Sequence, residues 1–135
     1  MLDWLKKLLF GVQPLGINQT SWLKALESGK YRQGKLFLCS FLNETGEAKF
    51  CCLGVACDNF AIHFIEERGI VRYLGESCKA PASVVGILAL YTRSGDTKDY
   101  KGPSLTYLND TAGLSFREIA AIIRKDPSVY FSEPR

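Results

Sequence analysis

Apolar positions recur along the chain at spacings that predict both helices and strands. A first amphipathic helix is expected over 20–28, a second from Leu53 to Gly69, and a third beginning at Pro81, because apolar residues recur there at i, i+3 and i+4. Proline suits the first position of the third helix, because the N–H that it lacks would have no intrahelical partner there.

Between these helices, continuous apolar runs and turn residues predict strands. Residues 35–43 are almost entirely apolar, and the turn at 43–46 leads back through 48–50, so a β-hairpin is expected. A third short strand is expected at 69–75.

The C-terminal part predicts a loop and two further helical segments. Residues 92–103 are polar and contain glycine and proline, which is typical of a mobile loop, and 105–108 is expected as a short helix or turn. Ser115 and Glu118 then form a capping box that starts the last helix. The whole chain, residues 1–135, therefore predicts one domain with an α+β fold: a small antiparallel sheet (a hairpin plus a third strand) packed against four or five helices.

The N-terminal segment predicts an amphipathic helix over residues 1–15, with Trp4, Leu5 and Leu8 on one face. Two lysines interrupt its apolar run and no small-residue cleavage site follows, so it does not fit a secretory signal. It is too short to cross a bilayer, which takes about 20 apolar residues. We expect it to dock on the core; contribution to a homo-oligomer comes second, and attachment to a membrane surface third.

Length and charge limit the classes of function. A chain of 135 residues is the size of one domain, and 17 Lys and Arg against 14 Asp and Glu give a net charge of +3. Residues 1–35 hold six basic and two acidic residues (+4), 36–67 hold one and five (−4), and 68–101 hold six and three (+3). The chain is therefore dipolar, which disfavours a basic protein that wraps nucleic acid.

The sequence offers few groups for catalysis or metal binding. Its five cysteines are an odd number that fits a reducing cytoplasm, and Cys51, Cys52 and Cys57 are expected as small core residues. There is no C-x-x-C pair, no phosphate-binding loop and no nucleophile elbow, and the single histidine, His63, is expected on a helix edge. We therefore expect no catalytic residues, no metal and no cofactor, and the balance is against an enzyme.

Three stretches carry distinctive motifs: WLKALESGKYRQGKLFL at 22–38, FCCLGVACDNF at 50–60 and LTYLNDTAGLSFREIAAII at 105–123. Together with the proline-led segment at 80–88, they resemble a family of small uncharacterised proteins common in phage and prophage genomes. The resemblance implies a viral or virus-derived accessory protein, in the cytoplasm of an infected or lysogenic host cell. The chain departs from the family pattern at Phe50, where tyrosine is usual, and the resemblance implies no activity and no site.

The loop after the first helix is the first candidate binding site. Lys30, Tyr31, Arg32 and Gln33 offer two cations, an aromatic ring and an amide, which suit a ligand that carries a phosphate and a base. The alternative is a tight structural connection in which Tyr31 packs on the core and Lys30 is solvated.

Arg93, Asn109 and Asp110 complete the candidate ligand-binding set. Arg93 lies in the expected mobile loop, together with Lys98. Asn109 and Asp110 would more simply form the cap and turn between two helices, with their side chains bonded to nearby backbone.

Three functions compete for this chain. The first is a non-enzymatic protein that binds and sequesters a small nucleotide-like ligand, such as a signal of anti-phage defence, and it predicts a defined pocket and an oligomer that shares it. The second is an interaction module that inhibits or adapts a host protein, and it predicts an exposed apolar patch. The third is a helix-turn-helix nucleic-acid binder at 105–125, although its second helix offers only Arg117, Arg124 and Lys125.

Overall fold

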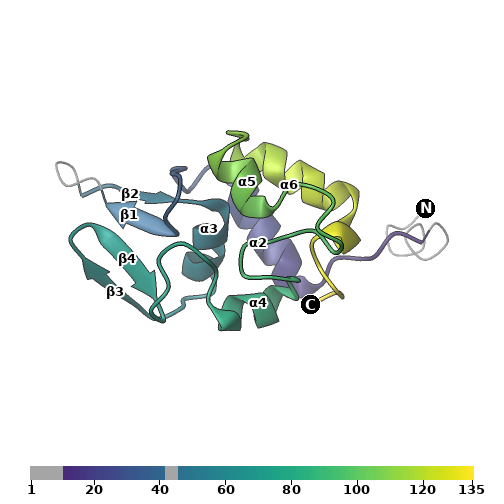
Figure 1. The fold of residues 1–135 in the computed structure, drawn as a ribbon, viewed down its shortest axis with the longest axis horizontal. Helices are drawn as coiled ribbons and strands as arrows, with labels where there is room; N and C mark the ends of the chain where they lie inside the picture. Colours follow the sequence, from purple (N-terminus) through teal and green to yellow (C-terminus); the bar gives the residue numbers. More distant parts are fainter. Residues whose placement is uncertain (1–10, 42–45) are drawn as a thin grey trace.

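The computed structural model describes residues 11–41 and 46–135 (Figure 1). Helices and one antiparallel sheet make up this part of the chain, which confirms the predicted α+β class. The helices are α2 (Ile17–Glu27), α3 (Cys52–Asn59), α4 (Ala82–Leu88), α5 (Leu105–Asp110) and α6 (Phe116–Lys125), followed by the 3-10 helix η1 (Pro127–Val129); the strands are β1 (Cys39–Phe41), β2 (Ala48–Phe50), β3 (Phe64–Glu67) and β4 (Ile70–Tyr73).

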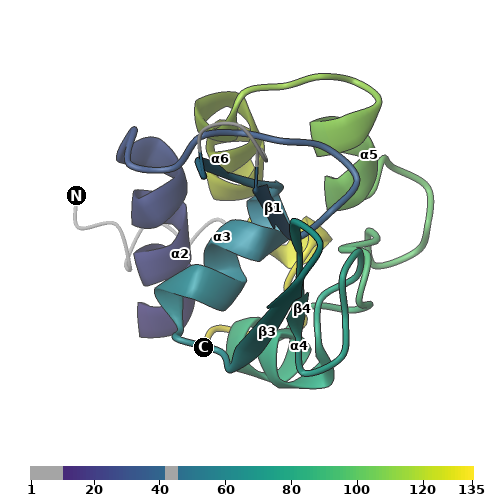
Figure 2. The same ribbon diagram turned by 90° about the vertical axis from the view of Figure 1, so that its left-hand side faces the viewer.

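The four strands form one sheet in the order β2-β1-β4-β3. The predicted hairpin is confirmed, because β1 and β2 pair antiparallel with Ser40 opposite Lys49. Ser40 also lies opposite Ile70 and so joins this hairpin to β4. The sheet occupies one end of the molecule, and α3 lies between it and α2 (Figures 1 and 2). Because β2 and β3 stand at the two ends of the strand order, they are the edge strands of the sheet.

Three predicted segments need correction where the structure describes them. The strand expected over 35–43 is shorter, because residues 35–38 form bends in which Leu36 takes a φ of 71° and is exposed. Most of the predicted helix over 1–15 lies outside the described residues, and the described part of it, 11–15, is not helical. Within 11–41 and 46–135, every helix is too short or too polar to cross a membrane.

The helix expected from Leu53 to Gly69 is also wrong in its second half, because α3 ends at Asn59. Ala61 takes a left-handed φ of 52° and donates its N–H to Asp58 O, while the Ile62 N–H donates to Cys57 O. These two bonds form a Schellman motif, which satisfies the last carbonyls of a helix and turns the chain away. The chain then enters β3, which the sequence pattern did not predict.

Replacing Ala61 by glycine is expected to stabilise the protein by about 1 kcal/mol, because alanine is strained at positive φ and glycine is not. Ala121, which is exposed within α6, supplies a control with the opposite expected effect. Glycine there should lower the free energy of unfolding by about 1 kcal/mol. Urea unfolding of both variants measures the difference. Equal losses of stability in Ala61→Gly and Ala121→Gly would contradict the left-handed helix end.

Trp22, on α2, is fully buried. Its indole Nε1–H donates to Cys52 O at 3.0 Å, so the first motif is bonded directly to the second. Cys51, Cys52 and Cys57 are buried, as predicted, and the Cys51 sulfur also accepts from the Gly54 N–H at the start of α3. The predicted capping box of α6 is confirmed in both directions between Ser115 and Glu118.

The segment 92–103 is anchored to the C-terminal part of the chain. The Lys98 N–H donates to Val129 O at 3.0 Å, and the Tyr130 hydroxyl donates to Pro103 O at 2.9 Å. The mobility predicted for this segment stays a prediction.

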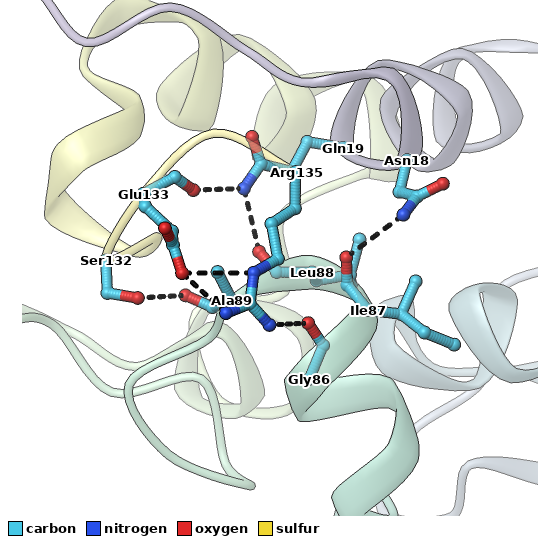
Figure 3. Close-up of polar contacts among 9 residues, drawn as sticks. All are labelled: Asn18, Gln19, Gly86, Ile87, Leu88, Ala89, Ser132, Glu133 and Arg135. Atoms are coloured by element: carbon cyan, nitrogen blue, oxygen red, sulfur yellow. Dashed lines mark hydrogen bonds and ion pairs between the residues drawn. The ribbon is translucent and has the colours of Figure 1, made fainter.

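Residues 132–135 close over the end of α4, and we call this arrangement the C-terminal clasp (Figure 3). The last carbonyls of a helix have no partner within it, so they need donors from elsewhere. In this protein α2 and the clasp supply them. The bonds run from Arg135 to Gly86 O (2.5 Å), from Asn18 to Ile87 O (3.4 Å), from Gln19 to Leu88 O (2.8 Å) and from the Ser132 N–H to Ala89 O (2.8 Å).

Gln19 is the centre of this arrangement and is fully buried. Its amide nitrogen also donates to Glu133 O at 2.7 Å, and its amide oxygen accepts from the Gly16 N–H at 2.9 Å. Gly16 is required there, because a Cβ at this position would lie 2.2 Å from the backbone of Arg135.

Candidate functional site

Gln33 and Asn109, both predicted to bind ligand, are hydrogen-bonded to each other inside the protein. We call the cluster of hydrogen bonds around Asn109 the Asn109 joint. Asn109 is fully buried, and its Oδ1 accepts from Gln33 Nε2 at 2.9 Å and from the Cys52 N–H at 3.2 Å. Its Nδ2 donates to Gly34 O at 2.9 Å and to Asp110 Oδ1 at 2.8 Å. Two donors and two acceptor positions are the full capacity of an amide side chain. The geometry therefore gives Asn109 a structural role, and its ligand role stays a prediction.

Asp110 extends the same joint to the loop before β1. Its Oδ1 accepts from the Leu36 N–H at 3.1 Å, which helps to hold this residue at its positive φ. Gln33 is fixed a second time, because its Nε2 also donates to Leu114 O at 2.8 Å. The structure thus brings Gln33, Asn109 and Asp110 together and uses them to connect α5 with the segment that precedes the sheet.

Tyr31 lies apart from this joint, against the sheet and α3. Its hydroxyl donates to Asp58 Oδ2 at 2.5 Å, and its ring meets the ring of Phe50 edge to face, with centroids 5.1 Å apart. Burial, reinforced by the hydrogen bond to Asp58, raises the pKa of Tyr31 above its ordinary value. The hydroxyl therefore stays protonated at neutral pH and remains a donor to the carboxylate.

The two cations beside Tyr31 are exposed and point to different neighbours. Lys30 places its Nζ 5.2 Å from the centroid of the Tyr31 ring, within the range of a cation–π contact. Arg32 pairs with Glu47, which leads into β2. Lys30 thus contacts the Tyr31 ring, whereas Arg32 is paired with the strand side of the loop.

Arg93 is not brought together with the other predicted residues. Its guanidinium pairs with Glu76, and its Nε donates to Ala80 O at 3.0 Å. The Ala80 N–H in turn donates to Arg93 O at 2.9 Å. Arg93 therefore stabilises the segment that leads into α4 through its contacts with Glu76 and Ala80.

A shallow pocket of about 340 Å³ opens between the end of α3 and the β3–β4 hairpin. This volume is at the small end of known ligand pockets. Asp58 connects the pocket to Tyr31, which is the only predicted ligand-binding residue to bond a lining residue among those described. The residues that line it are Asp58, Ala61, Ile62, His63, Phe64 and Tyr73.

The pocket combines aromatic rings with a carboxylate. The rings of Phe64 and Tyr73 are 5.6 Å apart and tilted by 57°, and Asp58 contributes the negative charge. The six lining residues include neither lysine nor arginine. Rings and a carboxylate attract a cation and repel a phosphate, so this pocket suits a positively charged group. We refer to it as the acidic–aromatic pocket.

His63 and Tyr73 were not predicted to take part in a site. His63 is exposed in the segment before β3 instead of lying on a helix edge, because α3 ends four residues earlier. Tyr73 is almost completely buried, and burial raises its pKa well above its ordinary value. Asp58 belongs to the motif at 50–60 and Tyr73 to the predicted strand at 69–75, but the rest of the lining comes from a helix end and a strand, β3, that the sequence pattern did not predict.

The thiols of Cys39 on β1 and of Cys51 at the start of α3 are buried. Burial raises the pKa of Cys39, which hydrogen bonds with Tyr73, to about 11, and the pKa of Cys51 to about 12. Thiols with such pKa values are protonated at neutral pH and are poor nucleophiles. Among the residues that the structure describes, no three His, Cys, Asp or Glu side chains cluster as metal ligands would.

The β3–β4 hairpin presents the second notable surface. All four residues of β3 are exposed, and Phe64 and Ile65 expose 50% and 63% of their surface although they point to opposite faces of the strand. Leu74, directly after β4, is 56% exposed. Side chains on both faces of β3 are therefore at least half exposed.

The helices α5 and α6 correspond to the segment considered for nucleic-acid binding. Arg124 donates two hydrogen bonds to Glu27, at 2.9 and 2.8 Å, and is therefore engaged within the protein. Arg117 and Lys125 remain exposed beside Glu118. A mixed charge of this kind gives no support for a recognition helix.

These features define a small α+β domain with an acidic–aromatic pocket beside an open strand edge. The chain belongs to the family described as "Domain of unknown function (DUF8296)", whose model matches residues 17–127. No curated protein and no solved structure matches the chain. The matched range spans α2 to α6, so it includes the Asn109 joint, the pocket and the hairpin.

Proposed function

We propose that the protein is a non-enzymatic interaction module that binds another protein through the β3–β4 hairpin. One observation carries the proposal: β3 is an edge strand whose residues are all exposed, with Phe64, Ile65 and Leu74 at least half exposed around it. Open strand edges with apolar neighbours are sites where other chains add. The high pKa values of the buried thiols support a role without nucleophilic catalysis.

The resemblance to phage and prophage proteins supports a host protein as the partner, in the cytoplasm of an infected or lysogenic cell. Inhibition or adaptation of that protein requires only a stable complex. The chain could also form a homo-oligomer, and in that case the hairpin would face a second copy.

A photo-crosslinking amino acid at position 65 tests the proposal in cells that express the full chain. We expect a discrete crosslinked product from this position, and competition by excess unlabelled protein. Position 122 provides the matched control, because Ile122 is also an exposed isoleucine but lies on α6. Equal crosslinking at the two positions, or none at position 65, would refute the hairpin as the docking site.

A second candidate is the binding of a small nucleotide-like ligand, of which only the base, and not the phosphate, would enter the acidic–aromatic pocket. A base could stack on Phe64, donate to Asp58 and place its phosphate near Lys30, which lies beside Tyr31. Native mass spectrometry of the purified protein tests this candidate. A nucleotide-sized mass that is lost in Asp58→Asn and Tyr31→Ala would support it, and an empty protein after incubation with infected-cell extract would argue against it.

A further inference from the structure

We infer that the β3 edge binds an extended, basic segment of the partner protein as an added strand, with an arginine side chain in the acidic–aromatic pocket. This inference rests on the proposed function and adds the conformation and the charge pattern of the bound segment.

The backbone of β3 offers unpaired groups at its outer side. The Leu74 N–H donates to His63 O at 3.1 Å, which identifies this pair as hydrogen-bonded across the hairpin. Hydrogen-bonded and non-hydrogen-bonded pairs alternate along an antiparallel ladder. Ile65 therefore bonds toward β4, whereas Phe64 and Glu66 direct their N–H and C=O groups outward. An added strand can bond to these groups.

A tight two-residue turn connects β3 to β4. Arg68 and Gly69 connect the strands with φ values of 54° and 81°, and positive φ at both positions is what a type I′ turn requires. The Glu66 side chain accepts from the Gly69 N–H at 2.6 Å and so stabilises the turn. The edge therefore belongs to a defined hairpin.

The two faces of the hairpin differ in chemistry. Phe64 and Glu66 lie opposite Tyr73 and Val71, which are buried, so this face turns toward α3 and the pocket. Ile65 lies on the outer face, opposite Arg72. Alternate residues of an added strand would meet these two faces in turn.

The face toward the pocket is acidic, because Asp58 lines the pocket and Glu66 lies on the same side of β3 as Phe64. The nearby cations lie elsewhere, Arg68 in the turn and Arg72 on the outer face. The bound segment should therefore alternate basic residues, facing the pocket, with apolar residues that cover Ile65. Arginine suits the pocket best, because its planar guanidinium can stack on the aromatic rings and hydrogen bond to the carboxylate at the same time.

A second copy of this chain fits the edge poorly. Antiparallel pairing of two β3 strands would bring Glu66 and Glu67 of each copy to the same short ladder, where like charges repel. A basic strand gains from the same carboxylates. The charge pattern thus selects a different protein over self-association.

Fluorescence anisotropy with labelled peptides tests the inference on the full chain. The peptide RVRVRV carries the alternating pattern, and RRRVVV has the same composition and charge in the wrong order. We expect RVRVRV to bind at least about tenfold more tightly, because only the alternating order places an arginine at the pocket and valines on the outer face. Equal affinities would overturn the inference.

Variants separate the backbone and pocket contributions. Asp58→Asn should weaken RVRVRV binding by about tenfold or more, whereas Asp99→Asn, at an exposed position that does not line the pocket, should not change it. Tyr31→Phe removes the hydroxyl that occupies Asp58 and should leave binding unchanged or tighter. Glu66→Pro removes an outward N–H and should abolish binding, whereas Glu66→Gln should retain part of it. Circular dichroism verifies that each variant is folded.

The outcomes distinguish this inference from the proposed function. Crosslinking at position 65 without selective peptide binding would keep the docking site and reject the basic strand. Absence of crosslinking would reject the docking site itself. Dimers that form at position 65 and exclude the peptide would overturn the basic strand in favour of a second copy.

Discussion

Replacing Gly54 by alanine is expected to lower the free energy of unfolding by about 4 kcal/mol or more. A Cβ at this position would lie 1.6 Å from Leu38 O and 2.5 Å from Leu38 C. Both are backbone atoms and cannot move aside as a flexible side chain can, so α3 would have to separate from the segment that leads into β1. The residues 52–57 are all buried, so such a shift would open the core. Urea unfolding measures the loss.

Gly86 provides a matched control for this variant. It also lies within a helix, α4, but a Cβ there would meet no atom within 4 Å. Alanine has the higher helix propensity, so Gly86→Ala should be neutral or stabilising by up to about 1 kcal/mol. Similar unfolding midpoints for the Gly54 and Gly86 variants would contradict the close packing of α3 on Leu38.

Replacing Asn109 by alanine is expected to cost about 3 to 5 kcal/mol. The substitution would leave the buried Cys52 N–H and the Gly34 carbonyl without their partner, and would remove one of two acceptors of Gln33. Each buried polar group left unsatisfied costs about 1 to 3 kcal/mol. Thermal unfolding should show a large decrease in Tm.

The control for this prediction is Asn59→Ala. Asn59 donates a single exposed hydrogen bond to Ser21 Oγ, so its loss should cost less than about 1 kcal/mol. If Asn109 served a ligand instead of the fold, Asn109→Ala would change ligand binding while its Tm stayed near that of the parent protein. A small shift for both variants would therefore reject the structural role.

Local signals predicted those elements whose residues are close in sequence. Ser115 and Glu118 are three residues apart and satisfy one another, so the start of α6 could be inferred from two residues. The β1–β2 hairpin was likewise accessible, because it depends on a short segment with an unusual composition. The buried cysteines followed from their apolar neighbours.

The missing strand β3 shows where such inference fails. Phe60 and Phe64 continue the helical spacing of α3 by coincidence, and the residue that ends the helix is Ala61, where glycine is the usual signal. A Schellman motif on alanine leaves no mark in the sequence. Because β3 was missed, the pocket and the open edge were missed with it.

The candidate ligand-binding residues show a different limit. Gln33 and Asn109 carry side chains that could bind a nucleotide, and their types do not reveal that each is already bonded to the other across 76 residues of sequence. Polar joints of this kind depend on which segments the whole fold brings together. A buried structural amide and a ligand-binding amide therefore look alike until the tertiary contacts are known.

The C-terminal clasp has a consequence for synthesis on the ribosome. Gln19 reaches its bonding partners at Leu88 and Glu133 across 69 and 114 residues. While those residues are still inside the exit tunnel, the Gln19 amide lacks its hydrogen-bond acceptors. Contacts between residues so far apart in the sequence also form slowly. The helical layer is therefore expected to remain incomplete until residue 133 emerges. Arrested chains shorter than this should stay sensitive to protease, whereas chains extended by a long linker should become resistant.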